Sequence, residues 1–126
     1  MRQKIIAGNW KMNNDKEETK SLINSLKSIS FSKDVKVMIV PSYIHLSDAA
    51  EMLKDHKIDV LAQNMHFLNN GAYTGSISAK MLKSVGCKYV IIGHSERREY
   101  QKETSKELNL KIEIAIKNNL KVIYCI

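Results

Sequence analysis

The chain has 126 residues, which is the length of one small domain. Hydrophobic residues make up 44% of it and charged residues 26%, and these fractions exclude an intrinsically disordered chain. The formal net charge of +7 would suit an anionic partner such as a phosphate, a nucleic acid or an acidic membrane, but lysines spread along the chain are more typical of a solvated surface.

The first predicted element is a strand at residues 5–8, because this short run is almost continuously apolar. Such a run is typical of a parallel strand that is covered on both faces. A helix is predicted next, with Asn14 and Glu17 as its start signal. Its apolar positions at helical spacing are Leu22, Ile23, Leu26 and Ile29. A second apolar run at residues 37–40 predicts the second strand.

The middle of the chain repeats this alternation. A helix is predicted from an apolar stripe of Leu46, Ala49, Ala50 and Leu53. The third strand is predicted at residues 60–63. The helix after it has a stripe of Ile77, Met81, Leu82 and Val85, and Gly86 stands where a helix commonly ends.

The last third of the chain continues the same pattern. The fourth strand is predicted at residues 89–93 and the fifth at residues 122–126. Between them, Thr104 and Glu107 form a capping-box signal for a helix. The apolar stripe of this helix is Leu108, Ile112, Ala115 and Ile116.

Strands and helices in strict alternation indicate a parallel α/β sheet with right-handed crossovers. A doubly wound sheet and a (β/α)₈ barrel both fit this order, and the pattern alone leaves both open. The sequence ends within its fifth apolar run, with no helix to cover that strand, which is unusual for a complete domain because a hydrophobic edge stays bare.

Several classes of protein are disfavoured. The apolar run near the N-terminus is too short for a signal peptide, and no run reaches the length of a membrane span. Cys87 and Cys125 lie far apart and form neither a disulfide framework nor a C-x-x-C motif, so reduced thiols in a cytoplasmic protein are expected. The sequence has no nucleotide-binding glycine motif and no zinc-type histidine spacing, so no cofactor and no metal are predicted.

Reactive residue types follow the predicted strands. In parallel α/β folds, functional groups collect at the C-terminal ends of strands. The residues in these positions are Asn9 to Asn13, Pro41 with Ser42, Gln63 with Asn64, and His94 to Arg98. A lysine, a histidine and a glutamate are therefore expected on the same side of the sheet.

Three segments resemble the triosephosphate isomerase family, in the order and spacing of that family. They are residues 7–13 (Ala-Gly-Asn-Trp-Lys-Met-Asn), 71–75 (Gly-Ala-Tyr-Thr-Gly) and 90–98 (Val-Ile-Ile-Gly-His-Ser-Glu-Arg-Arg). The resemblance implies a partial TIM (β/α)₈ barrel with the first five parallel strands and four helices. It implies one incomplete barrel domain over residues 1–126, with the C-terminal half absent.

The resemblance also implies an activity, the interconversion of dihydroxyacetone phosphate and glyceraldehyde 3-phosphate through an enediolate. This reaction belongs to glycolysis, gluconeogenesis and pentose phosphate-linked carbohydrate metabolism. The implied partners are a triose phosphate substrate and, in the full-length enzyme, a second copy of the chain, with no nucleic acid and no membrane. The implied location is the cytoplasm.

Catalytic roles for Lys11, His94 and Glu96 follow from the same resemblance. Lys11 would face the substrate phosphate and the developing oxyanion, and Asn9 would donate a hydrogen bond to a substrate oxygen. His94 would polarise the carbonyl as a neutral imidazole, which a helical turn starting at Ser95 favours through its positive end. Glu96 resembles a family carboxylate near the lysine. Read without the family, Lys11 and Glu96 are ordinary surface charges and His94 is a structural histidine.

The family likeness also assigns a dimer interface. The loop with Tyr73, Thr74 and Gly75 would project from one subunit toward the pocket of the other. Without the resemblance, this segment reads as an ordinary turn. Ser76 stands where the family usually has a glutamate able to pair with an arginine such as Arg97, so one ion pair between subunits is uncertain.

A full barrel needs roughly 250 residues. By the resemblance, the catalytic glutamate and the lid loop lie beyond Ile126, so residues 1–126 are expected to be inactive alone. An alternative is a non-catalytic half-barrel that acts only by associating with another chain through its exposed strand edges. A basic nucleic-acid-binding module is the weakest alternative, because only 6% of residues are aromatic.

Overall fold

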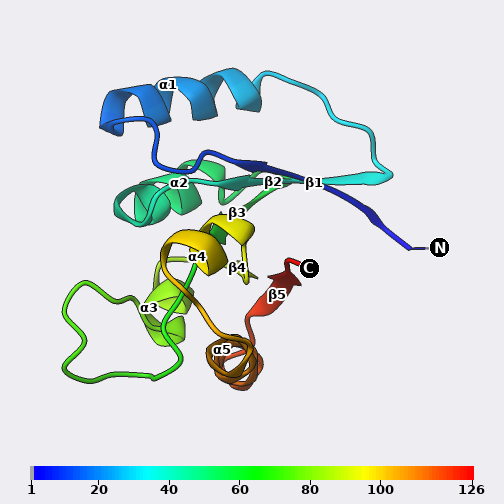
Figure 1. The fold of residues 1–126 in the computed structure, drawn as a ribbon. Helices are drawn as coiled ribbons and strands as arrows, with labels where there is room; N and C mark the ends of the chain where they lie inside the picture. The colour runs from blue at the N-terminus through cyan, green and yellow to red at the C-terminus, as the bar shows by residue number, and fades with distance from the viewer. Residues whose placement is uncertain (1) are drawn as a thin grey trace.

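The computed structural model describes residues 2–126 and has one five-stranded parallel sheet in the order β1-β2-β3-β4-β5. Each strand lies beside the next one in the sequence, so every connection is a crossover through at least one helix. The strands are β1 (Lys4–Asn9), β2 (Val35–Val40), β3 (Ile58–Ala62), β4 (Tyr89–Ile92) and β5 (Lys121–Tyr124). The sheet is curled, which confirms a partial TIM barrel and excludes the doubly wound alternative (Figure 1).

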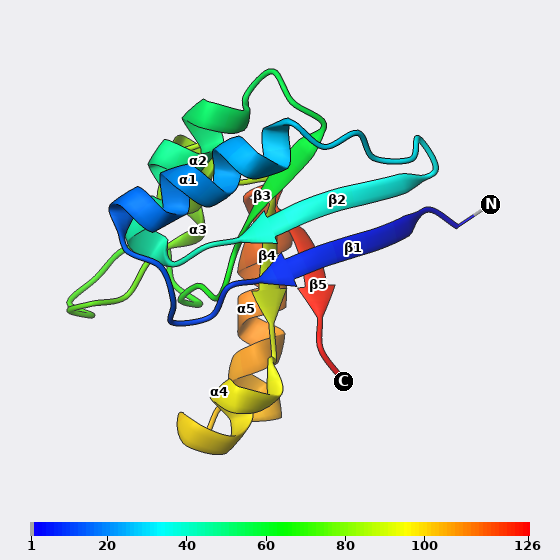
Figure 2. The ribbon, with the colours of Figure 1, turned by 90° about the horizontal axis from the view of Figure 1, so that it is seen from above.

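Five α-helices and one short 3₁₀ helix join the strands of the described chain. They are α1 (Lys16–Lys27), η1 (Tyr43–His45), α2 (Leu46–Leu53), α3 (Ala79–Ser84), α4 (Ser95–Tyr100) and α5 (Ser105–Lys117). The short α4 comes in addition to the four predicted helices. Helices α1 and α2 lie outside β1 to β3, and α3 and α5 lie outside β4 and β5 (Figures 1 and 2).

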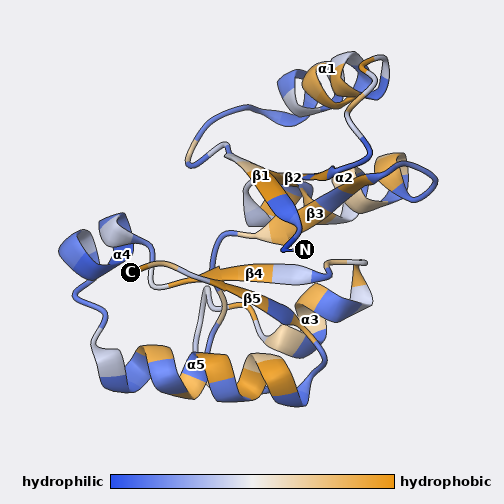
Figure 3. Ribbon diagram, turned by 90° about the vertical axis from the view of Figure 1, so that its right-hand side faces the viewer, coloured by the Kyte–Doolittle hydropathy of each residue, from blue (hydrophilic) through white to orange (hydrophobic). Residues whose placement is uncertain are grey.

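The hydrophobic core has two parts, one on each face of the curled sheet. The larger part lies between the convex face and the helices, where Ile39, Val60 and Ile92 pack against residues such as Ile23 and Leu108. The smaller part lies on the concave face and consists of Met38, Val40, Leu61, Tyr89 and Ile91. Hydrophobic residues accordingly dominate the strands in Figure 3. Burial on both faces explains why the middle strands read as continuous apolar runs.

The two outer strands differ from this expectation. β1 is exposed along most of its length, with Ile5 47% and Ile6 62% exposed. β5 is half-buried or exposed, and Tyr124 is 43% exposed. The prediction that all five strands are covered on both faces is therefore wrong for β1 and β5, the two outer strands, whose side chains stay exposed or half-buried.

Helix α1 begins one residue later than predicted. Asp15 has an extended backbone and accepts a hydrogen bond from the amide of Glu18, whose side chain accepts one from the amide of Asp15. Asn14 cannot take this role because its backbone is left-handed, with φ of 72°. The capping box that Thr104 and Glu107 predict for α5 is confirmed.

The apolar stripe of α5 is interrupted by a charge. Leu108 and Ala115 are buried as predicted, but Ile116 is 63% exposed. Lys111 is instead 5% exposed, because its ammonium finds a carboxylate partner inside the protein. The part of the chain that the structure describes has no helix long and apolar enough to cross a membrane.

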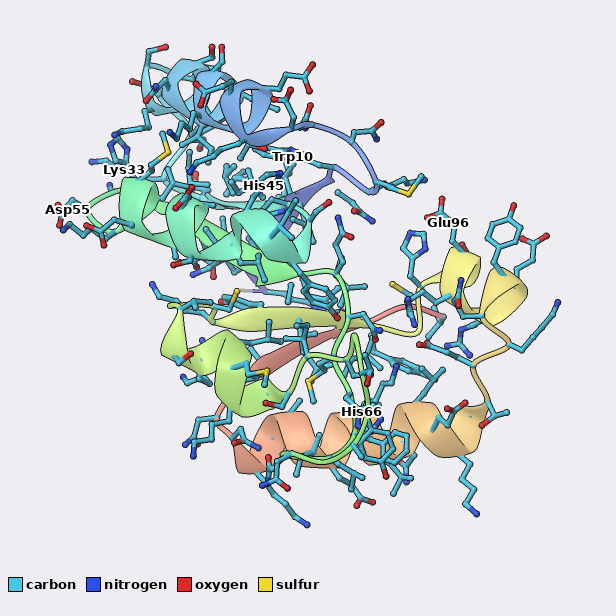
Figure 4. All side chains as sticks on the ribbon, turned by 90° about the vertical axis from the view of Figure 1, so that its left-hand side faces the viewer. Trp10, Lys33, His45, Asp55, His66 and Glu96 are labelled. Carbon is cyan, nitrogen blue, oxygen red and sulfur yellow. The ribbon has the colours of Figure 1, made fainter. Side chains whose placement is uncertain are left out.

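Because all the strands run parallel, their N-terminal ends form one rim of the sheet and their C-terminal ends form the opposite rim. Lys33 and Asp55 precede β2 and β3, and Glu96 follows β4. Figure 4 shows Glu96 on the opposite side of the molecule from Lys33 and Asp55. The residues that follow each strand, where the sequence places its reactive groups, therefore share one rim.

Candidate active site

The C-terminal rim contains a cavity of about 280 Å³ that brings together the residues singled out in the sequence. Asn9, Lys11, His94 and Glu96 all line it. They come from the end of β1, the loop after it, and the first turn after β4. In the strand order, β2 and β3 lie between β1 and β4, and the curl of the sheet brings the ends of β1 and β4 toward each other. The structure therefore places these four predicted residues in one cavity, while their roles remain predictions.

Lys11 is held through both its backbone and its side chain. Its amide donates to Oδ1 of Asn9 at 3.0 Å, which leaves the NH₂ group of Asn9 free of this bond. Its carbonyl accepts from Gln63 and from Ser42. Its ammonium lies 2.5 Å from Oε1 of Glu96, although the two residues are 85 positions apart in the sequence.

The ion pair sets the charge state of Glu96. The hydrogen bond from Lys11 lowers the pKa of the Glu96 carboxyl and outweighs burial, which raises it, and the positive charge of the Lys11 ammonium lowers this pKa further. Both partners are about half exposed, with side-chain exposures of 51% and 43%. An ion pair this open to water positions the lysine more than it stabilises the fold.

His94 is the N-cap of α4, and its ring is fixed by the backbone. Nδ1 accepts a hydrogen bond from the amide of Glu96 at 3.1 Å. A ring nitrogen that accepts from an N–H carries no proton, so the neutral imidazole has its proton on Nε2. The helical turn that the sequence predicts at Ser95 is present as α4. His94 can therefore act as a hydrogen-bond donor through Nε2.

Two polar residues at this rim had no role assigned from the sequence. Gln63 and Ser42 follow β3 and β2, and their strand-end positions were the only signal. Both donate to the carbonyl of Lys11, at 2.7 Å and 3.1 Å. No sequence pattern indicates this contact, because it depends on the path of the loop after β1.

A buried charge network lies beside the cavity. Glu103 accepts from Arg97 at 2.7 Å and from Lys111 at 2.6 Å, and Lys111 also donates to Asn64 at 2.9 Å. Burial raises the pKa of Glu103, but the two cationic donors outweigh it and leave that pKa below its ordinary value. Arg97 thus has a carboxylate partner within its own chain.

The predicted interface residues lie on a loop away from the cavity. Tyr73, Thr74 and Gly75 belong to the long connection between β3 and α3, which projects from the body of the molecule (Figures 1 and 2). The ring of Tyr73 lies 4.3 Å from that of His66, which also stacks on Phe67 at 4.4 Å. This aromatic contact gives the loop a defined shape while Tyr73 stays 46% exposed.

The remaining candidates outside the cavity are the two cysteines, and both are free thiols. Cys87 is buried, and burial raises the pKa of its thiol to about 12. Cys125 is half-buried, and burial raises its pKa as well. Across residues 2–126, no group of three or more His, Cys, Asp and Glu side chains is arranged to hold a metal ion.

Comparisons with known proteins show which family the chain resembles. The family model described as "Triosephosphate isomerase" matches residues 4–126. Proteins named triosephosphate isomerase from Flavobacterium psychrophilum and Alkaliphilus oremlandii are each 48% identical over 126 residues, covering 99% and 100% of this chain and 50% and 51% of the relatives. One from Clostridium botulinum (strain Loch Maree) is 48% identical over 125 residues, covering 99% of this chain and 50% of that protein. The chain spans about half the length of these relatives.

Proposed function

The chain belongs to the triosephosphate isomerase family, and from that premise we propose that it forms the first half of an enzyme that interconverts dihydroxyacetone phosphate and glyceraldehyde 3-phosphate. The observation that supports this most directly is the shared cavity of Asn9, Lys11, His94 and Glu96. In this proposal residues 1–126 are an incomplete barrel domain, and the polypeptide that completes the barrel closes the cavity. The setting is cytoplasmic glycolysis and gluconeogenesis.

Each side chain of the cavity has a chemical task in this reaction. The ammonium of Lys11 attracts the substrate phosphate and stabilises negative charge on the substrate oxygen as the enediolate forms. The free NH₂ group of Asn9 donates to a substrate oxygen. Nε2–H of His94 donates to the carbonyl oxygen without being a strong acid, because the ring is neutral. Glu96 holds Lys11 in place through its ion pair.

The isomerisation also needs a base that removes a proton from the substrate carbon. Glu96 is the carboxylate of the cavity, but its lowered pKa and its ion pair with Lys11 make it a weak base. We therefore assign the base to polypeptide beyond Ile126, in agreement with relatives of twice the length. Residues 1–126 alone are expected to show no measurable isomerisation and to aggregate or associate weakly.

The same proposal includes a homodimer. The loop with Tyr73, Thr74 and Gly75 projects from the body of one subunit, as a segment that inserts into a second copy must (Figure 1). Its aromatic contacts fix its shape before binding, which lowers the entropic cost of association. Arg97 does not need a partner from the other subunit, because Glu103 already pairs with it.

The test uses a polypeptide that continues past Ile126 to the length of the relatives. Lys11→Met and His94→Gln are each expected to lower kcat/KM by about 10²- to 10³-fold, which corresponds to roughly 2.7 to 4 kcal/mol for one lost donor to the oxyanion. Lys33→Met, on the opposite rim, is the matched control and is expected to retain the full rate. Full activity of Lys11→Met would refute the role of Lys11, and robust turnover by residues 1–126 alone would refute the missing base.

A second candidate function is supported by the edges of the sheet. β1 exposes Ile5 and Ile6, and β5 exposes Tyr124, so both edges could pair with another chain. Residues 1–126 would then act without catalysis, by associating with another polypeptide. A stop codon directly after Ile126 in the natural reading frame would favour this candidate over the isomerase.

A further inference from the structure

The backbone of Lys11 adopts a conformation that a residue with a side chain rarely takes. Its φ is 57°, in the left-handed region that favours glycine. Such a conformation costs free energy and persists only where the surrounding contacts fix it. Lys11 also carries the side chain that the proposed function places at the substrate phosphate. The contacts that hold its backbone therefore determine where its ammonium lies.

Gln63 makes the shortest of the contacts to the Lys11 carbonyl. Its Nε2 donates at 2.7 Å to that carbonyl and at 3.2 Å to the carbonyl of Val40, the last residue of β2. One half-buried amide thus joins the loop after β1 to the ends of β2 and β3. Ser42, which follows β2, donates to the same Lys11 carbonyl at 3.1 Å.

We propose that Gln63 is a positioning residue, which holds Lys11 in its left-handed conformation and thereby keeps the lysine ammonium against Glu96 and inside the cavity. The side-chain amide suits this task because it offers two N–H donors to two carbonyls and carries no charge that would compete for Lys11. Without these bonds the loop after β1 can relax to a right-handed backbone at Lys11, which turns the side chain to another direction. This inference rests on the proposed function for its catalytic meaning, but its geometric part can be tested alone.

The readout is the titration of the Glu96 side chain, because Glu96 responds to the position of the Lys11 ammonium. The carboxyl ¹³C resonance of Glu96 is followed against pH at low ionic strength in the polypeptide that continues past Ile126 to the length of the relatives. Lys11→Met is the reference and is expected to raise the pKa of Glu96, since it removes the cation. Gln63→Met is expected to raise that pKa by at least half as much. Gln3→Met, an exposed glutamine at the N-terminal end of β1, is the matched control and is expected to change nothing.

A second variant covers the case in which Gln63→Met does not fold. Gln63→Asn keeps an amide but is one methylene too short to reach both carbonyls, and it is expected to shift the Glu96 titration in the same direction. If Lys11→Met shifts the titration and both Gln63 variants leave it unchanged, the inference is overturned. If Lys11→Met shifts the titration but does not lower turnover in the longer polypeptide, the proposed function fails and the positioning of Lys11 by Gln63 is still decided by the titration.

Discussion

Nζ of Lys111 lies 2.6 Å from Oε1 of Glu103, and the two side chains are only 7% and 4% exposed. The same carboxylate oxygen accepts a bond from Arg97, so one acceptor joins α4 to α5. Buried charges of this kind are destabilising unless they are paired. The network lies beside the candidate active site, through Asn64 at the end of β3. Its integrity therefore affects both the fold and the shape of the rim.

Lys111→Met is expected to lower the free energy of unfolding by roughly 3 kcal/mol, the lower end of the range for a broken buried pair, because Arg97 still donates to Glu103. Lys106→Met, exposed on the same helix, is the control and is expected to stay within about 0.5 kcal/mol of the original chain. Urea unfolding followed by the fluorescence of Trp10 gives both values. Equal effects of the two substitutions would mean that the buried pair contributes nothing.

Acid is expected to weaken the fold through Glu103. Its folded pKa lies below the ordinary value of 4.5, so its contribution to stability is complete above that pH and is lost as the pH falls through the folded pKa. The free energy of unfolding should therefore decrease as the pH falls below about 4.5 and through the folded pKa of Glu103. Glu103→Gln removes this titration, so its unfolding free energy should fall less steeply over the same range. An identical slope in both proteins would contradict the lowered pKa.

The sequence predicted the strands well and their ends less well. Apolar runs mark parallel strands because both faces of a middle strand are buried. The ends depend on pairing between strands, and β2 extends back to Val35 because that residue pairs with Lys4 of β1. The predicted apolar stripe of α5 was wrong about Ile116 and Lys111 for a related reason. Burial of a lysine depends on a carboxylate eight positions away, which helical periodicity does not encode.

In the candidate site, too, the sequence predicted some features and could not predict others. The rule that reactive groups follow parallel strands was enough to place Lys11, His94 and Glu96 on one rim. It could not assign a task to Gln63, because the contact of Gln63 with the Lys11 carbonyl requires the left-handed backbone of Lys11. Nothing in residue type or spacing indicates that conformation. Contacts that depend on loop geometry are therefore visible only in the structure.

The start of α1 offers a test between the predicted and the observed capping box. Asp15→Ala is expected to lower the free energy of unfolding by about 1 kcal/mol, because it removes the acceptor for the amide of Glu18. Glu17→Ala is the control, since Glu17 would be part of the box only if Asn14 were the N-cap; a change within about 0.5 kcal/mol is expected. Urea unfolding of the two variants decides the matter. A larger effect of Glu17→Ala would restore the start that the sequence predicts.

Alanine substitutions at Gly93 and Gly75 distinguish the stability cost of backbone strain from the cost of a steric clash. Both have left-handed backbones, with φ of 81° and 87°, so alanine at either position costs about 1 kcal/mol in strain. A Cβ at Gly75 meets nothing within 4 Å, whereas one at Gly93 would lie 2.7 Å from Nη2 of Arg98 and 3.2 Å from the carbonyl oxygen of Cys125.

A Cβ at Gly93 would disturb the hydrogen bonds of the Arg98 side chain. Its guanidinium donates to the carbonyls of Gly93 and Cys125, both at 2.7 Å, and so joins the ends of β4 and β5. Gly93→Ala displaces it and is expected to cost about 3 kcal/mol, as strain plus one weakened hydrogen bond to a charged group. Gly75→Ala is expected to cost only about 1 kcal/mol. Thermal and urea unfolding of the two variants measure the difference, and equal losses would show that Arg98 can move aside without weakening the junction beside His94.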